Sequence, residues 1–184
     1  YVAVNGLPDL ESAMQTETYS YLNPAIEMRF LPDKGMYGLF ATALIPAGDL
    51  LTMWGGRVLT TSQYALLPPF LMSHGLQIEE DLFLVPLVEG EPADYFNHCC
   101  APNAGFSSPI SLVALGDIQS GDEICFDYAM SEDNHFDEFP CSCGAVTCRG
   151  QVSGKDWLLP EIQQRYFGYF SPYLQRRLEK MRAG

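Results

Sequence analysis

Cysteine is the residue type whose spacing suggests chemistry most directly in this chain. Cys141, Cys143 and Cys148 follow one another in the run CSCGAVTCRG, with CxCx4C spacing. Three thiolates in one tight loop form a soft ligand set of the kind that tetrahedral zinc favours. A fourth ligand is then required, and the run NHCCAPN offers two candidates, Cys99 and Cys100. The two runs together predict a zinc site that joins two separate segments of the chain.

Disulfide bonds are the alternative to a metal at these cysteines. No basic segment followed by an apolar run opens the sequence, so no secretion signal indicates an oxidising compartment, and we favour zinc. The sixth cysteine, Cys125, stands in the apolar run EICFDY and is expected to be a buried strand residue. Four thiolates leave no open coordination position, so we expect the metal to be structural.

Length and composition favour one acidic globular domain with at most a terminal appendage. The chain has 184 residues, 47% hydrophobic and 18% charged, and 23 acids against 10 bases give a net charge of −13. Such a field repels a polyanion and attracts a cationic peptide, so we expect no direct nucleic-acid binding, although acidity that serves only solubility is the alternative. No apolar run approaches the ~20 residues of a membrane span, and we expect an intracellular protein, cytoplasmic or nuclear, with no membrane partner. The start at Tyr1 suggests a trimmed piece of a longer protein.

The pattern along the chain changes after the last cysteine of the CxCx4C run. Between residues 26 and 115, short apolar runs alternate with glycine and proline, which predicts many short strands. Residues 1–24 have few periodic apolar positions and are expected to form a loosely attached arm. Residues 63–73 are a candidate helix, interrupted at Pro68-Pro69.

Two short helices are expected near the C-terminus. Pro160 marks the first turn of one, which Gly168 ends, and Ser171-Pro172 marks the start of the second. The second helix should present one apolar stripe, formed by Leu174, Leu178 and Met181. The aromatic residues of this region favour docking onto the β core over a ligand site.

These motifs, taken together, resemble the SET-domain protein lysine methyltransferases. NHCCAPN, GDEICFDY and CSCGAVTCRG are similar, in order and spacing, to the NHSCxPN, GEELxFDY and post-SET CxCx4C signatures of that family. The runs GEPADYFN, VALGDI and KGMYGLFATALIPAGDLL are similar to further family segments, and the resemblance covers roughly residues 25–150. It implies a mainly β fold of small curved sheets with a C-terminal pseudoknot, a zinc-bound post-SET loop and C-terminal helices. It also implies that the pseudoknot brings residues 97–103 beside residues 123–128.

The resemblance also implies an organisation of the chain and a ligand set. The expected parts are an arm at 1–24, a SET domain at 25–130, a post-SET zinc segment at 131–152 and a helical extension at 153–184. Cys100 is the position that joins Cys141, Cys143 and Cys148 on zinc, and Cys99 stands where the family usually has serine.

The resemblance assigns roles to residues that would surround S-adenosylmethionine and a lysine. Tyr128 would place its hydroxyl beside the transferring methyl group, Phe126 would leave room for di- or trimethylation, and Trp54 would form an aromatic channel wall. The implied cofactor-binding residues are Gly35, Met36, Tyr37, Asn97, His98, Tyr128 and Trp157, although core packing is an equal alternative for Trp157. Four further positions depart from the family pattern: Met36 replaces a usual glycine, Trp54 a usual tyrosine, Arg57 a usual glutamate and Asp94 a usual arginine.

The function implied by the resemblance is S-adenosylmethionine-dependent methylation of a lysine in a basic protein segment, such as a histone. The reacting lysine must be neutral, although its free pKa is ~10.4, and a dry aromatic channel beside a sulfonium would favour the neutral amine. The first alternative is an inactive binding module of the same fold that recognises lysine-rich partners. The second is a zinc-stabilised interaction domain with no cofactor.

Overall fold

The computed structural model describes residues 18–32, 35–136 and 138–183, and it is mainly β, as the sequence predicts. An eight-stranded sheet has the order β1-β4-β10-β9-β11-β3-β2, and β8 pairs with β11 off this path. A three-stranded sheet has the order β5-β7-β6, and β12 and β13 form a two-stranded ribbon. The strand bounds are β1 Tyr21–Leu22, β2 Ile26–Leu31, β3 Met36–Ala41, β4 Leu50–Met53, β5 Arg57–Thr60, β6 Leu76–Glu79, β7 Leu82–Val85, β8 Asn97–His98, β9 Ala104–Ser108, β10 Ser111–Ala114, β11 Glu123–Phe126, β12 Phe139–Pro140 and β13 Gln151–Val152.

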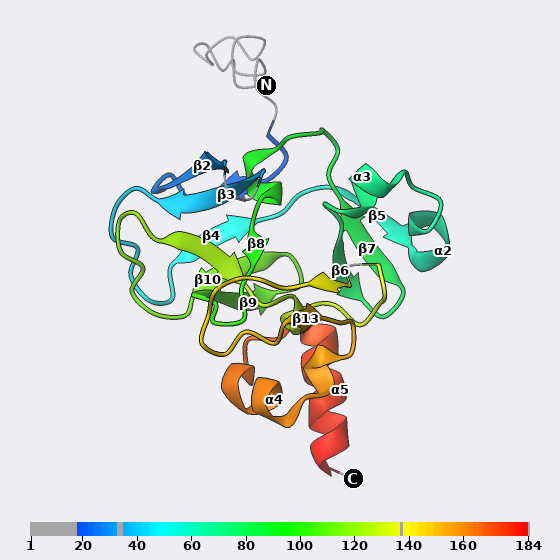
Figure 1. Cartoon of the computed structure of the whole chain (residues 1–184). Helices are drawn as coiled ribbons and strands as arrows, with labels where there is room; N and C mark the ends of the chain where they lie inside the picture. The colour runs from blue at the N-terminus through cyan, green and yellow to red at the C-terminus, as the bar shows by residue number, and fades with distance from the viewer. Residues whose placement is uncertain (1–17, 33–34, 137, 184) are drawn as a thin grey trace, which may run out of the picture.

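Helices are short and lie at the margins of the sheets. The three-stranded sheet carries α2 and α3 on one side of the molecule, and α4 and α5 extend from the opposite end to the N-terminal strands (Figure 1). Their bounds, with those of three 3-10 turns, are α2 Thr61–Tyr64, α3 Pro69–Met72, η1 Pro92–Asp94, η2 Tyr128–Met130, η3 Asp156–Leu158, α4 Pro160–Tyr166 and α5 Pro172–Ala183. Among the described residues, no helix combines the length and apolarity needed to cross a bilayer.

The expected interrupted helix around residue 68 is present as two separate turns. Thr60 caps α2 in a reciprocal box, because the backbone N–H of Gln63 donates to the Thr60 hydroxyl and the Gln63 side chain accepts from the Thr60 backbone N–H. Pro69 opens α3, where its missing N–H leaves no intrahelical hydrogen bond unmade. The Pro-Pro pair therefore separates the two turns, as the sequence indicates.

The inner end of the segment expected to form an arm is part of the main sheet. Residues 1–17 lie outside the described residues, but Tyr21–Leu22 form β1 and pair antiparallel with β4. The Ser20 backbone N–H and hydroxyl donate to the Glu91 carboxylate at 3.0 and 2.8 Å. The prediction of a loose arm up to residue 24 is therefore wrong for this part of it. A strand of two residues is too short to show the alternating pattern by which strands are predicted.

The two C-terminal helices occur where the sequence predicts them, and α5 docks through part of its expected stripe. Leu174 and Leu178 are fully buried in the main core, whereas Met181 is 57% exposed. Met181 lies in the last turn of α5, which projects away from the sheets (Figure 1). The stripe is therefore correct for its first two members and wrong for the third.

Leu178→Ala should lower the free energy of unfolding by about 2–5 kcal/mol, because it opens a cavity where the last helix meets the core. Urea denaturation measures this change. Met181→Ala is the matched control on the same helix and should change the free energy of unfolding by less than about 0.5 kcal/mol. Equal effects of the two substitutions would contradict the docking of α5 described above.

Candidate active site and metal centre

The strand β11 brings together segments that are far apart in sequence. It pairs in parallel with β8, with Cys125 opposite Asn97 and Phe126 opposite His98, and it also pairs with β9 and β3. The Asn103 amide group fixes this crossing, since its Nδ2 donates to the Glu123 carbonyl at 2.9 Å and its Oδ1 accepts from the Cys125 N–H at 3.0 Å. The expected meeting of 97–103 with 123–128 is therefore present.

Four thiols converge where the loop of residues 141–150 reaches this crossing. The sulfur atoms of Cys100, Cys141, Cys143 and Cys148 all lie within 4.8 Å of one another. This donor set matches a closed tetrahedral zinc site, so these residues could hold the metal that the sequence predicts. Burial raises the pKa of the Cys141 thiol to about 11, and a divalent cation would offset that cost by stabilising the thiolate. Cys99 lies outside this set, and its sulfur accepts from the Ala101 N–H.

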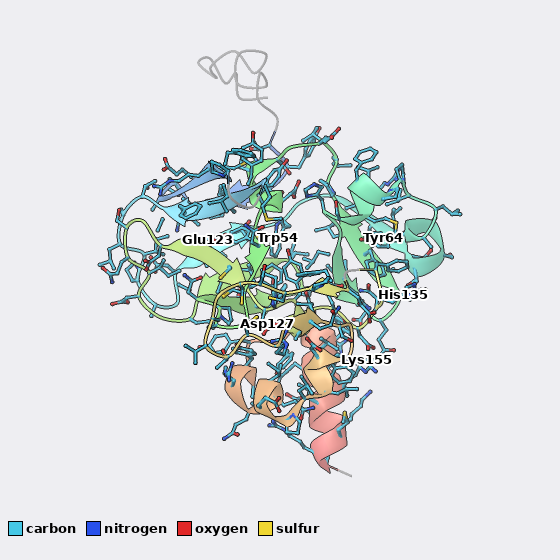
Figure 2. The ribbon with its side chains drawn as sticks, in the orientation of Figure 1. Trp54, Tyr64, Glu123, Asp127, His135 and Lys155 are labelled. Atoms are coloured by element: carbon cyan, nitrogen blue, oxygen red, sulfur yellow. The ribbon has the colours of Figure 1, made fainter. Side chains whose placement is uncertain are left out.

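A buried ion pair holds the same loop at a second point. Arg149 Nη1 and Nη2 donate to the two Asp127 carboxylate oxygens at 2.6 and 2.8 Å, and Arg149 Nε donates to Asp156 at 2.8 Å. The Asp127 side chain is 0% exposed and lies near the centre of the molecule (Figure 2). Asp127 also accepts from the Ala129 N–H and so caps the turn η2 that begins at Tyr128. The loop with Arg149 therefore fixes the residue before Tyr128.

His98 is neutral and connects the tyrosine to the thiol cluster. Burial lowers the pKa of its imidazole to about 4; Asp127 opposes this shift and Arg149 adds to it. Nδ1 accepts from the Tyr128 backbone N–H at 3.3 Å, so the proton of the neutral ring resides on Nε2. Nε2 lies 3.3 Å from the sulfur of Cys100, to which it can donate. One tautomer therefore serves both neighbours.

A cavity of about 560 Å³, called the wide cavity below, opens beside Tyr128. Its lining consists of Met36, Ser73, Asn97, His98, Tyr128, Phe139, Pro140, Cys141, Ser142 and Cys143. Asn97 is held by its Nδ2, which donates to the Tyr37 carbonyl at 3.0 Å and to Glu123 Oε1 at 2.9 Å. Four of the residues predicted to bind a cofactor, Met36, Asn97, His98 and Tyr128, therefore line one cavity, and the Tyr37 carbonyl helps to hold Asn97.

Three predicted cofactor residues, Gly35, Tyr37 and Trp157, do not line this cavity. Gly35 lies at the preceding turn with φ of 66°, a conformation that favours glycine. Trp157 is 2% exposed in the main core, its Nε1 donates to Asp133 at 2.9 Å, and Arg177 stacks on its ring. Core packing, the alternative for Trp157, is what the structure has. Docking of the C-terminal helices produces this burial.

Phe139 is the lining aromatic residue that sequence reasoning missed. Its ring lies 5.7 Å from the His98 ring and 6.0 Å from the Tyr128 ring, centroid to centroid. It stands two positions before Cys141, so closure of the thiol cluster brings it over the cavity. Its closeness in sequence to Cys141 was the signal from which its place at the cavity could have been predicted.

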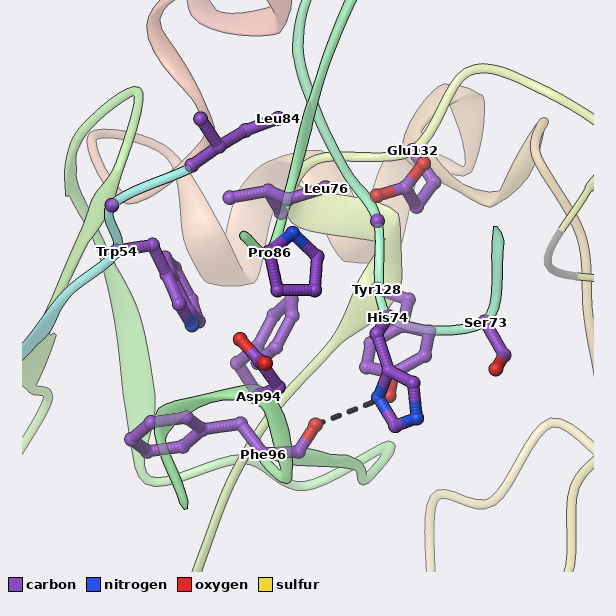
Figure 3. A pocket seen from close by; sticks show the side chains of 13 residues that line it. Trp54, Ser73, His74, Leu76, Leu84, Pro86, Asp94, Phe96, Tyr128 and Glu132 are labelled. Atoms are coloured by element: carbon purple, nitrogen blue, oxygen red, sulfur yellow. Dashed lines mark hydrogen bonds between the residues drawn. The ribbon is translucent and has the colours of Figure 1, made fainter. Parts of the chain in front are cut away.

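A second, smaller pocket of about 50 Å³, called the narrow pocket below, also borders Tyr128 (Figure 3). Trp54, Phe96, Phe126 and Tyr128 form its aromatic wall, and Asp94 also lines it. The Trp54 Nε1 donates to the Ala93 carbonyl at 2.7 Å, and the Tyr128 hydroxyl donates to the Phe96 carbonyl at 3.1 Å. All three residues predicted to be catalytic, Trp54, Phe126 and Tyr128, therefore meet here. Tyr128 is shared by both pockets.

Comparison with known proteins identifies relatives for this arrangement. The family model described as SET domain matches residues 36–129. A histone-lysine N-methyltransferase of Mycosarcoma maydis, described as H3 lysine-4 specific, is 31% identical over 128 residues, which cover 61% of this chain and 9% of that protein. The histone-lysine N-methyltransferase trithorax of Drosophila melanogaster is 27% identical over 125 residues, covering 61% of this chain and 3% of that protein. The chain thus spans less than a tenth of the length of these two relatives.

Solved structures share the fold. A crystal structure of KRYPTONITE in complex with mCHG DNA and SAH matches with a TM-score of 0.54 and 24% identity over 68% of this chain and 28% of that one. A second KRYPTONITE structure, with mCHH DNA, an H3(1-15) peptide and SAH, matches with a TM-score of 0.53 and 22% identity over 71% of this chain and 30% of that one. At these identities the likeness concerns the fold.

Cys143→Ser should remove bound zinc, because it takes one thiolate from the four-sulfur cluster. Elemental analysis of purified protein should give about one zinc per chain before the substitution and far less after it. Cys125→Ser changes a buried cysteine outside the cluster and should keep the metal. Full zinc content in the Cys143 variant would rule out the proposed ligand set.

Arg149→Met should lower the free energy of unfolding by about 3–5 kcal/mol, because Asp127 would remain buried without its cation. Thermal and urea unfolding test this. Arg176→Met breaks an exposed ion pair with Glu79 and is the matched control, with an expected loss of at most about 1 kcal/mol. A similar small loss at both sites would show that the buried pair has little weight.

Proposed function

Because the chain belongs to the SET-domain family, we propose that it is a protein-lysine N-methyltransferase that uses S-adenosylmethionine. The observation that carries the proposal is the position of Tyr128, which lines both the wide cavity and the narrow aromatic pocket. A cofactor in the first and a lysine side chain in the second would meet at its hydroxyl group. The curated relatives described as histone-lysine N-methyltransferases support the same activity.

The residues of the wide cavity fit the cofactor. Asn97 presents a fixed amide, His98 presents a neutral ring, and Phe139 supplies an aromatic face for a flat base. S-adenosylmethionine, when bound, supplies a sulfonium methyl group. An amine can attack the methyl carbon in line, with the thioether as the leaving group. The chain's own contribution is to align the amine, since positioning of two reactants can account for about 7–11 kcal/mol of a barrier.

The narrow pocket suits the end of a lysine side chain. Its aromatic wall can pack against the methylene groups of the side chain, and burial in the pocket disfavours the charged ammonium form. The hydroxyl of Tyr128 already points at the Phe96 carbonyl, a geometry in which its oxygen can accept from an amine. Trp54 closes the wall, fixed by its bond to the Ala93 carbonyl.

We propose a basic, lysine-containing protein segment as the substrate. The net charge of −13 attracts such a segment, and one solved neighbour contains an H3(1-15) peptide. The expected absence of direct nucleic-acid binding rests on charge alone and stays a prediction; both KRYPTONITE structures contain DNA. A nuclear location follows as a proposal from the histone-directed relatives. The division into a SET domain at 25–130, a zinc segment at 131–152 and a helical extension at 153–184 also stays a proposal.

An inactive binding module of the same fold is the alternative function. It would keep the zinc cluster and the acidic surface while lacking turnover. The joint presence of Asn97, Phe126 and Tyr128 around two adjoining pockets favours the enzyme. Stabilisation by S-adenosylmethionine without methylation of any peptide would favour the module, and no stabilisation at all would favour a plain interaction domain.

Tyr128→Phe should lower methyl transfer to a basic peptide by on the order of 10²-fold or more, because the amine loses its orienting oxygen. Intact-mass analysis of the peptide measures transfer, and a thermal shift with the cofactor should remain. The same spectra count methyl groups, and Phe126 predicts more than one. Tyr169→Phe removes an exposed hydroxyl and serves as the control. Near-normal turnover in the Tyr128 variant would refute the role of its hydroxyl.

A further inference from the structure

Asp94 places a carboxylate inside the narrow pocket. It ends the turn η1, where its backbone N–H donates to the Glu91 carbonyl at 3.0 Å, and the neighbouring Ala93 carbonyl accepts from Trp54. The backbone is therefore fixed on both sides of the residue. Figure 3 shows the Asp94 carboxylate pointing into the pocket between the Trp54 ring and Tyr128.

The Asp94 carboxylate has no hydrogen-bond or ion-pair partner among the residues that the structure describes. The second carboxylate of the pocket differs, because Glu132 accepts from the Ser131 hydroxyl at 3.1 Å and from the Asn134 amide at 2.5 Å. Half-buried carboxylates are normally hydrogen-bonded, since loss of water around an anion is costly. The free acceptor capacity in this pocket therefore belongs to Asp94.

The surroundings of Asp94 disfavour its anionic form. Burial, together with the nearby Glu91 carboxylate, raises its pKa to about 7. Glu91 itself is held by Ser20 and cannot turn away easily. The other ionisable groups that line the pocket or flank the turn are His74, Tyr95, Tyr128 and Glu132. No lysine or arginine is among the residues that line this pocket.

We propose that Asp94 accepts the proton that the substrate lysine must lose before it is methylated. This inference rests on the methyltransferase function proposed above. An N–H bond of the ammonium breaks, its electron pair stays on nitrogen, and an O–H bond forms on Asp94. The amine then forms a bond to the methyl carbon while the carbon–sulfur bond breaks and leaves its electron pair on sulfur. Asp94 finally returns its proton to water at the pocket mouth.

The local electrostatics suit this role better than an ordinary carboxylate would. A lysine with a pKa of ~10.4 would transfer its proton to a free aspartate, with a pKa of ~3.9, with an equilibrium constant of roughly 10⁻⁶ to 10⁻⁷. A carboxylate with a pKa of about 7 improves that constant to roughly 10⁻³ to 10⁻⁴. Desolvation of the ammonium in the pocket narrows the gap between the two pKa values, whereas attraction between the ammonium and the carboxylate widens it. General bases work best when their pKa lies near the working pH.

Asp94→Asn should lower kcat by roughly 10²–10⁴-fold at pH 7.5, because the amide cannot take the proton. The wild-type kcat/KM should fall below about pH 7, and this break should be absent from the variant. The variant should instead gain activity continuously as pH rises toward 10, because solvent then supplies the neutral amine. A variant with wild-type turnover and the same break would overturn the proposal.

Two control variants isolate the role of this carboxylate. Glu89→Gln removes the same charge from an exposed position outside the pocket and should keep both rate and profile. His74→Asn removes the imidazole that lines the same pocket and should leave the break near pH 7 in place. If the fall of kcat/KM below about pH 7 disappeared in the His74 variant and remained in the Asp94 variant, the proposal would also be overturned.

A measurement without substrate separates this inference from the proposed function. A raised pKa means that Asp94 stabilises the fold while protonated, below pH ~4, and that this stability is lost as pH rises through about 7. Asp94→Asn should therefore raise Tm by about 4 °C or more at pH 8.5, and the gain should shrink toward pH 4. An unchanged Tm at pH 8.5 would refute the claim that Asp94 is an unpaired, destabilising carboxylate. Absence of methylation by the wild type, with the gain present, would refute the proposed function instead.

Discussion

The buried ion pair between Asp127 and Arg149 is the interaction on which both pockets depend. The Asp127 carboxylate is fully removed from water, so it requires a cation and hydrogen bonds at the same time, and Arg149 and the turn at Tyr128 supply them. Arg149 belongs to the loop of the late cysteines, whereas Asp127 follows the strand β11. If this loop detached, Asp127 would remain buried without a cation. The position of Tyr128 therefore depends on a segment outside its own sheet.

A metal at the four thiols and this ion pair would reinforce each other through His98. The neutral ring accepts from the Tyr128 backbone on one nitrogen and faces the Cys100 sulfur with the other. A protonated ring would lose the first of these bonds, and the burial that lowers its pKa prevents this in the neutral range. The cluster thus stabilises more than its own loop, because the tautomer that suits the sulfur also orients the tyrosine. Phe139 reaches the wide cavity for the same reason, since it directly precedes the clustered loop.

Sequence patterns predicted the parts of this structure that depend on local chemistry. Cysteine spacing indicated three ligands of the four-sulfur cluster, and the family resemblance implied Cys100 as the fourth. Short apolar runs indicated the β fold, and the proline and glycine signals located α4 and α5. The misses depend on tertiary packing. Trp157 and Phe139 are both aromatic residues near the cysteines, and only docking of the C-terminal helices decides which is buried. Tyr21–Leu22 form too short a strand to show alternation, and their pairing with β4 is a long-range event.

Asp94 illustrates how a departure from a family pattern gains meaning only from geometry. In sequence it is an acid where an arginine is usual, and surface acidity would account for it in a chain with a charge of −13. In the fold it is a half-buried acid facing the ring of Trp54, and the nearest fixed charge is another carboxylate. A group in that position lowers stability when ionised, and a protein that retains such a cost usually does so where chemistry requires it. A cationic side chain entering the pocket would relieve the cost, so the acid that weakens the empty fold is the one that favours the lysine.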